Sequence, residues 1–144
     1  MELSEENKKT LLLSVHQAIE ENAEHTVNHL FHNRTYKLIN YPPNGGLTEE
    51  EKEALGQMKE NEVLKSALRK VIASNTANVF FDFFNLLDGT ADPDTGKWSE
   101  VLLIDKPEDF DEHQEFLHDS FYETYWDWKE KRKNKNWSLE MPGG

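Results

Sequence analysis

The sequence predicts a mainly α-helical domain of about four helices with one short β element, a possible hairpin, near residues 97–105. Two observations carry this prediction. Apolar side chains recur at helical spacing over most of the chain, and residue patterns typical of helix starts and stops separate these stretches. At 144 residues the chain has room for one ordinary domain. We expect that domain to span residues 1–137, with a flexible tail at residues 138–144.

The first predicted helix runs from residue 5 to about residue 33, with residue 40 as its latest end. Ser4 is a suitable N-cap, and Glu5 and Glu6 suit the positive end of the helix dipole. Prolines and glycines within residues 41–46 cannot continue the helix. The stripe predicted to face the core consists of Leu12, Val15, Ile19, Ala23, Thr26, Val27 and Leu30.

Two further helices are predicted between residues 49 and 88. Thr48 and Glu51 form a capping-box pattern, which indicates a helix that begins near residue 49 and ends or bends around residues 59–61. Helical spacing of apolar residues resumes at Glu62. After Thr76 the apolar side chains surround the axis, which predicts a helix buried on all sides, with Gly89 as its stop.

The β element and the last helix complete the predicted fold. Residues 101–104 form a β-compatible run after a turn at residues 92–96, and the only candidate partner strand is residues 35–39. Asp109 and Glu112 form another cap pattern, which predicts a last helix that extends to about residue 133. This helix is rich in aromatic residues.

Composition excludes several classes of function. The chain has no cysteine, so disulfides, thiolate nucleophiles and Cys-rich zinc sites are ruled out. The N-terminus lacks the basic-then-apolar order of a signal peptide, and no apolar run approaches the roughly 20 residues that span a bilayer. We therefore expect a cytoplasmic protein with no membrane partner.

The charge of the chain is strongly acidic and unevenly placed. The formal net charge is -12, and residues 88–127 hold thirteen Asp and Glu against two Lys, a local balance of -11. Such a field repels phosphate backbones, so nucleic acid is not expected as a partner, whereas a basic protein would be attracted. The basic run at residues 129–135 suits the negative end of a helix dipole.

One row of side chains has the spacing of a metal site. Glu21, His25, His29 and His32 fall on one face of the first predicted helix, and neutral imidazoles so placed can bind zinc or nickel. That face lies opposite the core stripe, where ligands lack the second layer of hydrogen bonds that orients functional sites. A metal-binding protein or metal-dependent hydrolase built on this row is one alternative function; no other cofactor is expected.

Asp82 is the carboxylate that most requires an explanation, because it interrupts a run of phenylalanines in a helix predicted to be buried. With Asn75 and Asn78 it forms one line at helical spacing. Two interpretations stay open. The line is either the solvent strip or structural polar network of that helix, or it is part of a functional site. The acidic residues at 92–96 lack the ligands of a calcium-binding EF-hand, which favours a plain turn.

The preferred prediction is a small acidic module that binds a basic protein. In size, acidity and lack of cysteine the chain is similar to the immunity proteins that bacteria pair with nuclease toxins, a resemblance of general character that transfers no residue. The second alternative to this prediction is a structural homodimer through the aromatic last helix. The residues predicted to bind the partner are Asp82, Asp88, Asp92, Asp94, Trp98, Tyr122 and Trp126.

Overall fold

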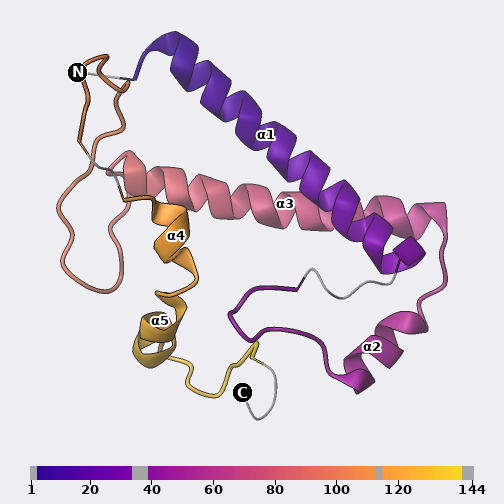
Figure 1. The fold of residues 1–144 in the computed structure, drawn as a ribbon. Helices are drawn as coiled ribbons and strands as arrows, with labels where there is room; N and C mark the ends of the chain where they lie inside the picture. Colours follow the sequence, from indigo (N-terminus) through magenta and orange to yellow (C-terminus); the bar gives the residue numbers. More distant parts are fainter. Residues whose placement is uncertain (1–2, 34–38, 113–114, 141–144) are drawn as a thin grey trace. The chain divides into compact units, whose positions relative to one another are not determined.

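The computed structural model describes residues 3–33, 39–112 and 115–140 (Figure 1). Within these ranges the protein is mainly helical, as predicted. The elements are α1 (Glu5–Asn28), the π-helical turn η1 (His29–Asn33), α2 (Glu49–Gly56), α3 (Glu62–Leu87), α4 (Leu117–Phe121) and α5 (Tyr125–Lys131). None of the helices in these ranges is both long enough and apolar enough to cross a membrane.

The predicted β element at residues 97–105 is wrong, because the described residues contain no strand. A strand needs a partner for its backbone hydrogen bonds. Of the partner run proposed at residues 35–39, residues 35–38 lie outside the described residues, and Ile39 belongs to no strand.

The chain groups into two compact units, and each unit is built from two separate stretches of sequence. Unit 1 combines Met1–Asn28 with Glu60–Phe110, and unit 2 combines His29–Lys59 with Asp111–Gly144. Unit 1 holds sixteen Asp and Glu against seven Lys and Arg, a formal balance of -9. Unit 2 holds twelve against nine, a balance of -3. Most of the net charge therefore belongs to unit 1.

In unit 1, helix α1 packs across α3 (Figure 1). Ile19, Ala23 and Val27 on the second half of α1 are buried, as their stripe predicts, whereas Leu12 near its start is 40% exposed. Burial of apolar side chains is the main stabilising term in such a contact. The contact therefore depends on the second half of α1.

Both ends of α3 carry the local signals that define it. At the start, the Oδ1 of Asn61 accepts the backbone N–H of Leu64 at 2.7 Å, which caps a helix amide. At the end, Gly89 takes a left-handed conformation with φ of +68°, and the N–H of Thr90 donates to the carbonyl of Asn85 at 3.0 Å. This is a Schellman ending, so the predicted stop at Gly89 is confirmed.

In unit 2, the predicted capping box is present at the start of α2. The side chain of Thr48 accepts the N–H of Glu51 at 3.1 Å, and the carboxylate of Glu51 accepts the N–H of Thr48 at 2.8 Å. The preceding loop pairs with the end of the described chain, because Gly45 forms an antiparallel β-bridge with Glu140.

The single last helix predicted for residues 109–133 is wrong. Instead of capping a helix, residues near Asp109 form a turn in which the N–H of Phe110 donates to the carbonyl of Pro107 at 3.2 Å. Farther on, α4 and α5 are separated, and the hydroxyl of Thr124 donates to the carbonyl of Phe121 at 3.0 Å. A side chain that bonds the backbone in this way competes with the helical ladder.

Candidate interaction surface

All seven side chains predicted to bind a partner are exposed, but they belong to different units. Unit 1 contains five of them: Asp82, Asp88, Asp92, Asp94 and Trp98. Unit 2 contains Tyr122 and Trp126. The larger group lies in the more acidic unit.

Two carboxylates of unit 1, Asp88 and Glu100, lie at the C-terminal end of α3. Asp88 is the C-cap of that helix, whose last turn contains no basic residue. Glu100 returns to the same end, because a Cβ placed on Gly89 would lie 3.8 Å from the Cδ of Glu100. A helix C-terminus carries partial negative charge, so carboxylates there are electrostatically unfavourable. Their position is therefore not explained by the stability of the helix.

The loop that follows α3 is held at its far end by Asp105. The backbone N–H of Ser4 donates to the Oδ1 of Asp105 at 3.1 Å. Hydrogen bonds from the Asn7 side chain and from Ser4 hold the pKa of Asp105 below its usual value. The loop carries Asp92, Asp94 and Trp98, and its two ends are thus joined to α3 and to the start of α1.

Tyr122 and Trp126 project from an aromatic cluster in unit 2. The ring of Tyr41 lies 6.0 Å from that of Phe121, 6.5 Å from that of Tyr122 and 5.5 Å from that of Tyr125. Tyr125 is buried, and burial raises the pKa of the Tyr41 phenol. Ring pairs at these distances restrain one another. The exposed edges of Tyr122 and Trp126 are therefore presented by a fixed support.

The histidine row falls across the boundary between the units. Glu21 and His25 lie on α1, whereas His29 and His32 lie in the π-helical turn η1. A π-turn winds less per residue than an α-helix, so the i, i+4, i+7 spacing no longer defines a single face. No group of three or more His, Asp or Glu side chains in the described part of the chain is placed to hold a metal ion.

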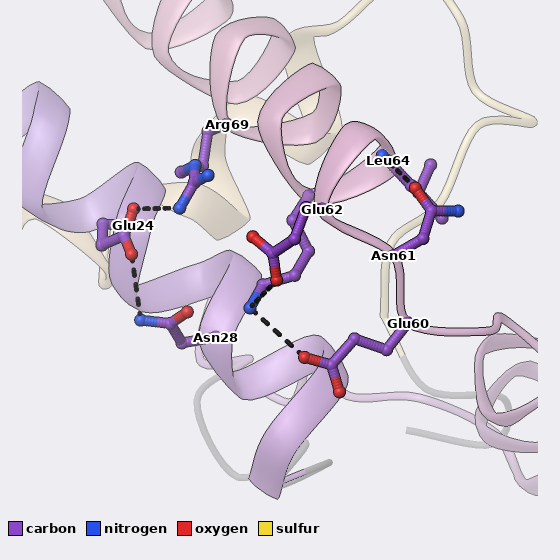
Figure 2. Close-up of polar contacts among 8 residues, drawn as sticks. Glu24, Asn28, Glu60, Asn61, Glu62, Leu64 and Arg69 are labelled. Carbon is purple, nitrogen blue, oxygen red and sulfur yellow. Dashed lines mark hydrogen bonds and ion pairs between the residues drawn. The ribbon is translucent and has the colours of Figure 1, made fainter.

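A polar pair that the sequence did not predict joins α1 to α3 (Figure 2). Arg69 of α3 donates to Glu24 of α1 at 2.8 Å and holds the pKa of Glu24 below its usual value. The ammonium of Lys65 is buried and lies 3.4 Å from Glu60 and 3.8 Å from Glu62. The Glu24–Arg69 pair is remote in sequence, leaves no local signal and links α1 to α3. The two Lys65 pairs are local to the start of α3.

The prediction that α3 is buried on all sides is wrong. Val71, Val79 and Phe81 are 64%, 60% and 68% exposed, and Asp82 is exposed among them. The line of Asn75, Asn78 and Asp82 therefore lies on an exposed side of the helix. The apolar residues beside it were assigned to the core, because periodicity identifies apolar side chains without showing which elements cover them.

Many large apolar side chains are exposed among the described residues, and on α3 they include Val71, Val79 and Phe81. Exposed apolar patches of this kind mark sites of interaction.

Comparison with protein-family models gave no match, and neither the curated proteins nor the solved structures gave one.

Proposed function

We propose that this protein is a small acidic module that binds a basic protein partner. The observation that carries the proposal is the cluster of carboxylates at the C-terminal end of α3 and in the loop beyond it, in a unit with a formal balance of -9. Asp88 stands at a helix terminus where negative charge is unfavourable. A cationic side chain that binds there would remove this penalty, which supports a basic partner.

Exposed aromatic side chains supply the second part of the proposal. Trp98 lies in the acidic loop of unit 1, and Tyr122 and Trp126 project from the aromatic cluster of unit 2. Aromatic residues dominate the binding energy of many interfaces, whereas charge complementarity mainly raises the association rate and selects the partner. We therefore assign steering to the carboxylates and anchoring to these rings.

The proposal is tested by affinity capture from a lysate of the native organism at about 0.05 M and about 0.3 M salt, with mass spectrometry of the retained proteins. We expect one basic protein retained in stoichiometric amount at low salt and lost as salt rises. If no basic protein is retained at either concentration, the proposal is wrong.

Charge variants then locate the binding surface. The variant Asp82→Asn, Asp88→Asn, Asp92→Asn, Asp94→Asn should weaken binding of the captured protein about tenfold at low salt. The matched control Glu6→Gln, Glu20→Gln, Glu50→Gln, Glu53→Gln removes the same charge from other exposed positions and should weaken binding about twofold or less. Equal losses in both variants would show that net charge alone is responsible.

A further inference from the structure

The outer face of α3 has the composition of a binding surface and not of a solvated helix. We define this face by six exposed residues: Val71, Asn75, Asn78, Val79, Phe81 and Asp82. Val71, Asn75, Asn78 and Asp82 follow one another at intervals of four, three and four, so they form one line along the helix. Phe81 and Val79 flank the line on its two sides.

The inner face of the same helix accounts for its packing. Lys65 is buried, and Ile72, Thr76, Phe80 and Phe84 are partly buried at helical spacing on the side away from Asp82. Helix α1 packs against α3. An exposed helix face is ordinarily polar, and a large apolar side chain left in water forgoes the favourable free energy of burial. Phe81, Val79 and Val71 thus retain apolar area that a second surface can bury.

Charge indicates what that second surface is. Between Lys70 and Leu87 helix α3 has no basic residue, and the one charged side chain on its outer face is the carboxylate of Asp82. Farther along lie Asp88 and the acidic loop. An apolar surface centred on a carboxylate and surrounded by negative field is complementary to an element that is apolar on one side and carries Lys or Arg.

We propose that the outer face of α3 docks an amphipathic helix of the basic partner, with apolar side chains against Val79 and Phe81 and a Lys or Arg directed to Asp82. This inference rests on the proposed function and names the surface and the partner element. The face extends about 16 Å from Val71 to Asp82, which about three turns of a partner helix would cover.

A second copy of this chain is a poorer occupant for the same reason. Its own outer face has no cation to offer Asp82, and unit 1 of each copy has a formal balance of -9. Like charges brought together at an interface cost free energy.

The test uses a synthetic helical peptide of Leu and Lys, about 18 residues long, and a counterpart in which Glu replaces Lys. Binding to the full-length protein is measured by fluorescence anisotropy at about 0.05 M salt. We expect the Lys peptide to bind and the Glu peptide to bind at least about tenfold more weakly. Equal binding of the two, or no binding of the Lys peptide, would overturn the inference.

Variants place the peptide on α3. Val79→Ser combined with Phe81→Ser should weaken binding of the Lys peptide about tenfold or more. The control Val63→Ser alters a valine that is 81% exposed in the first turn of the same helix, and it should change binding less than about twofold. An unchanged affinity in the double variant overturns the inference. The proposed function stands in that case if the Asp→Asn variant still weakens capture of the basic protein.

Two control measurements on the free protein identify other occupants. The double variant should keep the melting temperature within about 2 °C, because exposed side chains contribute little to folding. A much larger loss would show that this chain itself covers the face. Sedimentation of the wild type should give a monomer, and a dimer that the double variant dissociates would assign the face to a second copy. Either result overturns the inference.

Discussion

The ammonium of Lys129 lies 2.8 Å from a carboxylate oxygen of Glu140, whose side chain is only 4% exposed. Glu140 also accepts a hydrogen bond from the hydroxyl of Ser138 and pairs through its backbone with Gly45. One residue thus joins α5 to the loop before α2. The hydrogen bonds from Lys129 and then from Ser138 lower the pKa of Glu140 to about 2.

This shift predicts a specific dependence of stability on pH. A carboxyl whose pKa is lowered by folding stabilises the protein above its unfolded pKa, here 4.5, and loses that contribution as pH falls toward about 2. Glu140→Gln should lower the melting temperature at neutral pH. It should also make the melting temperature fall less steeply as pH decreases from 4.5 toward about 2. Thermal melts from neutral pH down to about pH 2 measure both effects. Parallel acid declines in wild type and variant would contradict this account.

A second prediction concerns Arg132, which is only 4% exposed. Its Nη1 donates to the Tyr125 hydroxyl at 3.4 Å, and its buried Nε has no acceptor among the residues described. The guanidinium also lies 5.5 Å from the Trp137 ring centroid, but a buried charge whose Nε has no acceptor is costly. Arg132→Met should therefore leave the free energy of unfolding unchanged or raise it by up to about 2 kcal/mol. Tyr125→Phe, which removes the acceptor but keeps the ring, should lower it by about 1 kcal/mol. Urea unfolding distinguishes these signs, and a large loss in Arg132→Met would disprove the assignment.

The third prediction compares two valines with opposite surroundings. Val27 on α1 is 0% exposed and Val71 on α3 is 64% exposed. Val27→Ala should cost about 2 kcal/mol of unfolding free energy, because it leaves a cavity where the side chain was buried. Val71→Ala should change stability by about 0.5 kcal/mol or less. If the two variants lose similar amounts, the outer face of α3 is covered in the free protein.

The fourth prediction tests the capping box of α2. Thr48→Ala removes the acceptor of the Glu51 amide and should cost about 1 kcal/mol. Thr48→Asp keeps an acceptor at that position and should restore most of the loss. Circular dichroism melts of the three proteins provide the measurement. Equal melting temperatures of Thr48→Ala and wild type would mean that the cap does not contribute to the stability of the protein.

Local signals in the sequence predicted those features that local geometry determines. The Thr48 and Glu51 box and the Gly89 stop lie where expected, because each depends on residues within one or two turns. The buried stripe of Ile19, Ala23 and Val27 followed from spacing alone.

Features that depend on distant partners were predicted poorly. The long last helix was predicted from the cap pattern of Asp109 and Glu112. Contacts remote in sequence act on this segment instead, because Tyr122 donates to Asn40 at 3.4 Å and Tyr125 packs on Tyr41. The acidic residues of the candidate surface were identified by charge. Its apolar part was assigned to the core. The sequence of a helix that is apolar on all sides does not show whether its own chain or a partner covers it.

The interleaved chain path has a consequence for how the protein assembles. The sequence passes between the two units after Asn28, Lys59 and Phe110, so unit 1 lacks its second segment until Phe110 has been synthesised. Residues 1–59 and the remainder of the chain each carry one segment of both units. A cut after Lys59 would therefore release no intact unit. When the two pieces are expressed together, they should reassociate as a split protein, because each unit needs one segment from each piece.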